Sequence, residues 1–261
     1  HQKRDCEFQP YGKIREINVR LLMPNELSGK IQTVTGTIIR DQLGTTLTHE
    51  HLFIDLARLF DPDVDDSNYE FFHSKLDTEV LGAIRYYHQA NHDNYQLLDK
   101  QTAIDEILLY KGYGGVSVVD ATSIGISRNP EGLRDISEQT GINIIMGSGF
   151  YVNDAHPDYV EHSSEKELAD QIIRDILEGV EGTGIRSGII GEIGCSWPLT
   201  VNEKKVLAAA AVAQKETGGS ILIHPGRDEG SPEEILEVLI ENKADLSRTI
   251  LGHIDRTVFD R

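Results

Sequence analysis

The sequence predicts an α/β fold of the (β/α)8 type, the TIM barrel, with about six of the eight barrel strands present. Short runs rich in β-branched residues alternate with amphipathic helical segments, which is typical of a parallel sheet. The last four runs end near positions 150, 192, 224 and 253, and these spacings of 42, 32 and 29 residues are close to the roughly 30 residues of one barrel unit. The length of 261 residues also suits a barrel, which typically has about 250.

The elements are expected in the following order. Residues 1–28 mix charges, glycine and proline without periodicity, and we interpret them as a tail or lead-in to one domain over 29–261. Residues 32–39 alternate as a strand does, and the first barrel strand is expected at 45–54. Residues 61–100 are polar and poorly bounded. The other barrel strands are expected at 115–120, 142–150, 188–193, 220–224 and 249–253.

Three of the helices have start signals. Ser164 and Glu167 form a capping box ahead of an apolar stripe. Ser231 precedes a proline that suits the first helical position. Asn202 is expected to cap the alanine-rich helix that follows it.

Charge and cysteine content narrow the possible partners and compartment. Forty-three acidic against twenty-five basic side chains give a net charge of −18, which disfavours nucleic acid and anionic membranes. No apolar run approaches the roughly 18 residues that a spanning helix needs. The two cysteines, Cys6 and Cys195, lie far apart in unlike contexts, so we expect no disulfide framework and a reducing, cytoplasmic location.

A His-x-His pair lies at the end of the first barrel strand. Side chains two apart on a strand point the same way, so His49 and His51 project together while Glu50 points away. Two converging imidazoles can hold a metal ion. Taken alone, such a pair is more often an ordinary surface or core feature.

Three later strands also end in potential ligands, namely Glu192, His224 and His253. A lone polar residue at a strand end is more often a core group with its own hydrogen bonds. The carboxyl ends of barrel strands, however, meet at the face where barrel active sites lie. Five nitrogen and oxygen donors on four strand ends therefore predict a metal site.

From about residue 29 to the C-terminus the chain resembles the phosphotriesterase branch of the amidohydrolase superfamily, and most closely its animal phosphotriesterase-related members. The matching segments are 44–51, 147–151, 188–200, 224–227 and 253–257. Long, ordered matches of this kind are highly specific.

The resemblance implies a metal-dependent hydrolase with two divalent ions, for which Zn²⁺ is expected. By resemblance, His49 and His51 would hold the more buried ion, His224 and His253 the more exposed one, and Glu192 would bridge them where many relatives use a carboxylated lysine. A hydroxide shared by two ions about 3.5 to 4 Å apart would attack the substrate, and Glu192 is thus also assigned to the catalytic site.

The substrate is expected to be a small molecule. Tyr151 could line the pocket, as the similar tyrosine does in related lactonases, although plain packing is an equal alternative. Arg227 could hold a carboxylate or sulfonate, with a surface salt bridge as its alternative role. The resemblance favours ester or amide bonds in N-acyl amino-acid-like substrates such as N-acetyltaurine-like amides. The alternatives are phosphotriester or lactone hydrolysis, and an inactive binding or regulatory protein.

Related proteins continue through two further β/α units, and their last strand carries an aspartate that binds the buried metal. This chain ends at Arg261. The expectation from the sequence is a truncated form, competent at most for partial metal binding. Unpaired sheet edges would favour pairing with another chain, and so a possible homo-oligomer.

Overall fold

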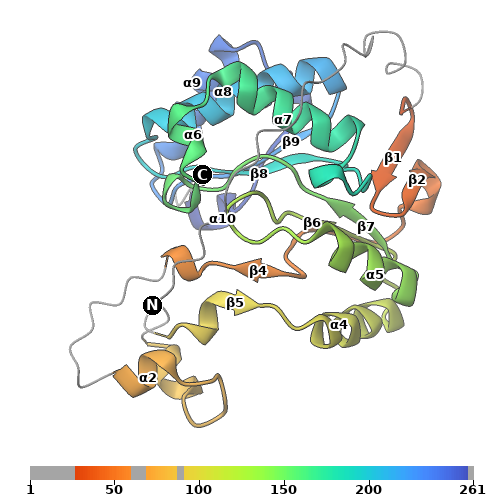
Figure 1. The fold of residues 1–261 in the computed structure, drawn as a ribbon, viewed down its shortest axis with the longest axis vertical. Coiled ribbons are helices and arrows are strands. Elements are labelled where there is room, and N and C mark those ends of the chain that lie inside the picture. Colours follow the sequence, from red (N-terminus) through yellow and green to blue (C-terminus); the bar gives the residue numbers. More distant parts are fainter. Residues whose placement is uncertain (1–26, 60–68, 87–90, 258–261) are drawn as a thin grey trace.

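A computed structural model of the protein describes residues 27–59, 69–86 and 91–257 (Figure 1). Most of the expected lead-in, and part of the polar segment 61–100, lie outside these described residues. Within the described ranges, no helix has the length and apolar character needed to cross a membrane.

Within the described residues, six parallel strands form the barrel wall. Each lies in a predicted barrel segment, although the first is shorter than the predicted range 45–54. Their order is that of the chain, in the two groups β3-β6-β7 and β8-β9-β10. A bridge between Ser148 and Gly191, and a 2.9 Å hydrogen bond from Gly188 N to Met146 O, join β7 to β8. The strands are β3 (Thr46–Glu50), β6 (Ser117–Asp120), β7 (Asn143–Met146), β8 (Ile190–Gly194), β9 (Ile221–His224) and β10 (Thr249–Leu251).

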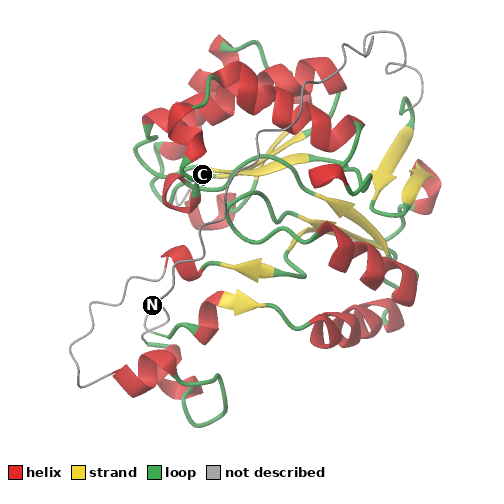
Figure 2. Ribbon diagram, in the orientation of Figure 1, coloured by secondary structure: helices red, strands yellow, loops and turns green. Residues whose placement is uncertain are grey.

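In the part of the chain that the structure describes, five long helices lie outside this wall, between successive strands (Figure 2). They are α4 (Lys100–Gly112), α5 (Pro130–Thr140), α7 (Glu165–Leu177), α8 (Val201–Thr217) and α9 (Ser231–Glu241). The largest apolar cluster lies between α7, α8 and strands β8 and β9, with Ile172, Ile193 and Leu207 fully buried. Small side chains at Ala209 and Ala210 let α8 approach its neighbours closely.

The shorter helices lie in the connections. The α-helices are α2 (Tyr69–His73), α3 (Leu81–Ile84), α6 (Tyr159–His162) and α10 (Ile254–Thr257). The 3-10 helices span Arg40–Gln42, Ala57–Leu59, Asp93–Tyr95, Asn153–Ala155, Val180–Gly182 and Leu246–Arg248.

The N-terminal strands differ from the prediction. Residues 32–39 are not one strand but part of a hairpin of β1 (Lys30–Thr33) and β2 (Gly36–Ile39), because Gly36 takes the positive φ of 133° that the turn needs. Val34 is buried, and its N–H donates to Ile144 O at 2.9 Å, so the hairpin packs against β7.

The predicted strand 45–54 is also interrupted. It is divided into β3 and the short strand β4 (Ile54–Asp55), which pairs antiparallel with β5 (Gln96–Leu97). The chain therefore turns directly after β3, at the predicted His-x-His motif.

The helix caps are partly as predicted. Ser164 and Glu167 form the expected capping box of α7. The prediction for α8 was wrong, because Thr200 is its N-cap and Asn202 lies inside the first turn. The α9 cap was misplaced by one residue, since Gly230 holds the N-cap position ahead of Ser231.

Candidate metal centre

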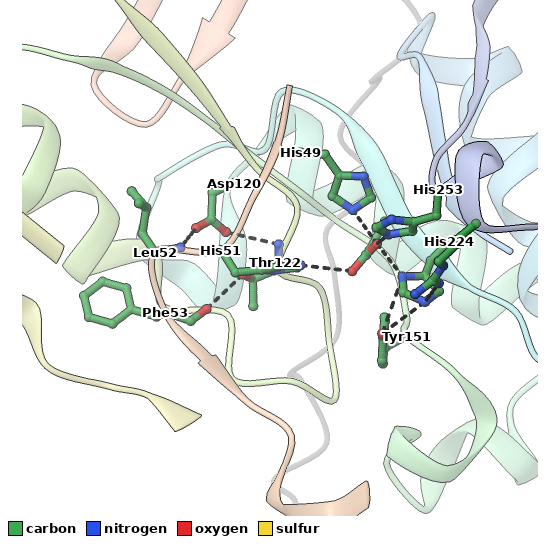
Figure 3. Close-up of polar contacts among 11 residues, drawn as sticks. His49, His51, Leu52, Phe53, Asp120, Thr122, Tyr151, His224 and His253 are labelled. Carbon is green, nitrogen blue, oxygen red and sulfur yellow. Dashed lines mark hydrogen bonds and ion pairs between the residues drawn. The ribbon is translucent and has the colours of Figure 1, made fainter. Parts of the chain in front are cut away.

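The four histidines predicted to bind metal converge at the C-terminal ends of the strands (Figure 3), and their distances to Glu192 place this carboxylate among them. His49 lies on β3 and His51 directly after it. Glu192 lies in β8, His224 ends β9, and His253 follows β10 by two residues. These residues span four strands and more than 200 positions of the sequence, so only the barrel brings them together.

Glu192 is the centre of the cluster. Its Oε2 atom lies 2.6 Å from His49 Nε2, 2.9 Å from His224 Nδ1 and 3.9 Å from His253 Nε2. Its Oε1 atom lies 3.3 Å from His51 Nε2. One ligand atom from each of Glu192, His49, His224 and His253 lies within 4.8 Å of the others, so these four could share one ion, with His51 set to the side.

The environment keeps Glu192 ionised. The side chain is only 1% exposed, and such burial opposes its charge. Hydrogen bonds from the surrounding imidazoles outweigh burial and hold the pKa of Glu192 well below its usual range. The site therefore presents a buried negative charge ringed by nitrogen donors.

His51 is oriented by Thr122, a residue that the sequence analysis missed. The Thr122 hydroxyl donates to Phe53 O at 2.9 Å, so it accepts from His51 Nδ1, also at 2.9 Å. A neutral His51 then points the lone pair of Nε2 at Glu192 Oε1, where two acceptors face each other. Only a positive charge between them, a proton or a metal cation, makes this contact favourable.

The contact between His51 Nε2 and Glu192 Oε1 indicates whether the side chains present suit a metal ion. Glu192 Oε1 is buried and has no hydrogen-bond partner in the described part of the chain. A buried oxygen of this kind needs a partner, and imidazole nitrogen with carboxylate oxygen is the donor set that Zn²⁺ and similar divalent ions accept. The residues present therefore fit a metal ion.

Asp120 holds the backbone beside His51 and at Thr122 through hydrogen bonds. The sequence analysis missed this residue as well. It is fully buried at the end of β6 and accepts hydrogen bonds from Leu52 N at 2.7 Å and Thr122 N at 3.1 Å. Burial raises the pKa of Asp120, although these bonds act against the rise. The sequence signal was available, since Asp120 ends an apolar strand and Thr122 follows two residues later.

The two predicted substrate residues lie on the His224 side. Tyr151 is buried, and its hydroxyl lies 3.5 Å from both nitrogens of His224, with the rings edge to face at 5.1 Å. Burial, followed by the charge of Glu192, raises the pKa of the Tyr151 phenol, so it stays protonated. Arg227 is exposed and lines an open cavity of about 360 Å³ beside His224, together with Trp197.

Arg256 is a further charged residue at this cavity to which the sequence analysis gave no role. It lies in α10, and its Nη2 atom is 2.7 Å from His224 Nε2. The Arg256–Thr257 pair was noted only as part of a matching segment, and no spacing in the sequence indicates its partner.

Comparison with known proteins agrees with the family resemblance found in the sequence. The profile of the phosphotriesterase family matches residues 29–261. An N-acetyltaurine hydrolase of Xenopus tropicalis is 42% identical over 90% of this chain and 68% of its own length.

Among solved structures, a resiniferatoxin-binding protein from Rhodobacter sphaeroides superposes with a TM-score of 0.84 at 37% identity, over 88% of this chain and 64% of that one. A phosphotriesterase homology protein from Escherichia coli gives a TM-score of 0.65 at 30% identity, over 82% and 63%. The chain thus spans about two thirds of the length of the proteins it matches.

Proposed function

The chain belongs to the phosphotriesterase family, and on that basis we propose that it is a metal-dependent hydrolase of amide or ester bonds with two Zn²⁺ ions. The observation that carries the proposal is the buried Glu192 carboxylate within reach of four histidines. Such ions, when bound, polarise a carbonyl or phosphoryl oxygen and activate water at neutral pH.

We assign the four histidines to two ligand groups that share Glu192, as the family resemblance implies. His49 and His51 would hold one ion, and His224 and His253 the other. Glu192 would be shared by both groups and would offset part of the added positive charge. Its Oε1 faces His51, whereas its Oε2 faces the other three rings, including that of His49. The bond from His51 to Thr122 fixes the ring nitrogen that is available as a ligand.

The proposed substrates are small N-acyl amino-acid-like amides that end in an anion, such as N-acetyltaurine. The name of the Xenopus tropicalis relative supports this class. Arg227, at the mouth of the His224 cavity, would bind the anion, and Tyr151 would border the reacting group. A neutral lactone or phosphotriester would gain nothing from Arg227, which makes these substrates the weaker choice.

A second candidate is a binding protein that keeps the metal site without turnover. One observation favours it, since the Rhodobacter sphaeroides structure with the TM-score of 0.84 is described as a resiniferatoxin-binding protein. Turnover separates this candidate from an enzyme.

We further propose one domain over residues 29–261 and a cytoplasmic location. Cys195 is buried and free, and burial raises the pKa of its thiol well above the usual value, as suits an inert thiol.

The test is acetate release from N-acetyltaurine by the purified protein. We expect activity that a chelator abolishes, that added Zn²⁺ restores, and that Glu192→Gln lacks. Glu216→Gln, an exposed position on α8, is the matched control and should retain full activity. Hydrolysis that survives chelation, or that Glu192→Gln retains, would contradict the proposal. Stoichiometric Zn²⁺ binding without turnover of amides, lactones or phosphotriesters would favour the binding protein.

A further inference from the structure

We propose that Arg256 and Arg227 together form the subsite for the anionic group of the substrate, and that Arg256 reaches this subsite by leaving His224 when that ring takes a metal ion. This inference rests on the proposed hydrolase function and names a second residue that selects its substrate.

Both arginines line the cavity beside His224. Within the described residues, neither forms an ion pair with a carboxylate. Asp228 also lines the cavity, but its Oδ1 accepts a 2.9 Å hydrogen bond from Gly230 N. Two guanidinium groups that share a cavity repel each other unless an anion lies between them.

An unpartnered donor of Arg256 supports this picture. Its Nε atom is buried and has no hydrogen-bond partner in the part of the chain that the structure describes. The guanidinium therefore has an unused donor beside a second guanidinium that lines the same cavity, and a carboxylate or sulfonate could accept hydrogen bonds from both.

The contact between Arg256 and His224 is incompatible with metal binding by His224. Arg256 Nη2 can only donate, so at 2.7 Å it uses the lone pair of His224 Nε2, while Nδ1 donates to Glu192 Oε2 at 2.9 Å. A neutral imidazole has a single lone pair of this kind. Ligation through Nε2 would take that lone pair, and ligation through Nδ1 would move the ring proton to Nε2.

Either way, Arg256 loses its acceptor when His224 becomes a ligand. The side chain then has the adjoining cavity available, where Arg227 already lies. The subsite is thereby completed only in protein that has the metal.

The overall charge of the chain adds a reason for such a subsite. At −18, the protein repels small anions from most of its surface. Two cationic side chains beside the ligand cluster provide the local attraction that an anionic amide requires. The favoured substrates are therefore amides whose amine part is short and ends in a sulfonate or carboxylate.

The first test measures Zn²⁺ affinity by competition with a chelator, without substrate. Arg256→Met keeps the length of the side chain but removes its donors. We expect it to bind Zn²⁺ about 2- to 10-fold more tightly than the parent protein, the range that one intramolecular hydrogen bond contributes. Arg248→Met, at an exposed position before β10, is the control and should not change the affinity. Unchanged or weaker Zn²⁺ binding by Arg256→Met would overturn the competition.

The second test measures binding of taurine to the Zn²⁺-loaded protein by calorimetry. We expect Arg256→Met and Arg227→Met each to weaken taurine binding by about 10-fold or more, as loss of a charged hydrogen bond does, with Arg256→Lys less affected. Binding of ethanolamine, which lacks the sulfonate, should not change. Equal taurine binding by parent and Arg256→Met would overturn the subsite. Both readouts are independent of turnover, so failure of the hydrolase proposal would be seen separately.

Discussion

Two buried carboxylates lie close in sequence and have opposite surroundings. Glu203, in the first turn of α8, is fully buried, and its two oxygens accept hydrogen bonds from Asn153 N, Ser196 N, Ser196 Oγ and Thr200 N at 2.7 to 3.0 Å. Glu192, in β8, is equally buried but is surrounded by imidazoles, and its Oε1 has no hydrogen bond within the described residues.

The difference lies in what the donors can do. The backbone N–H groups around Glu203 can only donate, so this carboxylate ties the loop after β7 to the loop after β8. An imidazole can exchange its proton for a metal ion, so the ring of histidines around Glu192 can be recruited as ligands. A buried carboxylate held by backbone amides therefore stabilises the fold, whereas one held by histidines marks a binding site.

The largest expected effect on stability comes from Glu203. Glu203→Ala leaves several buried donors without an acceptor, and we expect the free energy of unfolding to fall by about 3 to 5 kcal/mol. Unfolding by denaturant measures this fall in the free energy of unfolding. Glu203→Gln keeps one acceptor oxygen and should lose less. If Glu203→Ala is as stable as the parent protein, Glu203 does not stabilise the fold, and the contrast drawn with Glu192 is wrong.

A smaller effect is expected at Thr122, on metal binding rather than folding. Thr122→Val keeps the shape but removes the acceptor for His51 Nδ1. We expect Zn²⁺ affinity to fall about 10- to 100-fold, the usual result of losing a partner that orients a ligand histidine. Competition with a chelator measures it, with the exposed Thr37→Val as the control. Equal affinity in both variants would mean that His51 is not a ligand.

The smallest effect is expected at the cap of α7, which contacts neither carboxylate. Ser164→Ala removes the hydroxyl that accepts from Glu167 N, and should lower the free energy of unfolding by about 1 kcal/mol. Zn²⁺ content should stay the same. The comparison of the two carboxylates requires that stability and metal binding can be changed separately. A loss of metal in Ser164→Ala would show that they cannot.

The same cap predicts a pH effect. Hydrogen bonds from the Ser164 backbone and hydroxyl lower the pKa of Glu167 below its unfolded value. The stabilisation is therefore complete above the unfolded pKa and is lost as the pH falls through the folded pKa. Unfolding measured across this acidic range should show a smaller pH dependence in Glu167→Gln than in the parent.

The barrel and the ligand cluster could be predicted because each depends on a local pattern. An apolar run that ends in His224 or Glu192 indicates a strand and the position of its C-terminal end. The barrel topology then brings such ends to one face. The capping box at Ser164 is equally local. Thr200 and Glu203 show the same capping-box pattern, but Asn202 was predicted as the cap instead.

The residues that were missed have partners far away in sequence. Thr122 matters because it contacts His51, and Arg256 because it contacts His224, 32 residues away. Glu203 reads as a simple cap, while its bonds to Asn153 and Ser196 depend on how two loops pack. The hairpin at 30–39 was missed because a turn at Gly36 divides one alternating run into two strands.

The most direct test of the central claim is the Zn²⁺ content per chain after dialysis, in the parent protein, Glu192→Gln and Glu203→Gln. We predict two equivalents in the parent, more than the partial binding expected of a truncated form. We also predict loss of metal in Glu192→Gln with folding retained, and full metal content in the folded fraction of Glu203→Gln. If Glu192→Gln kept its metal, or if the two variants lost it equally, Glu192 would not be the centre of the site.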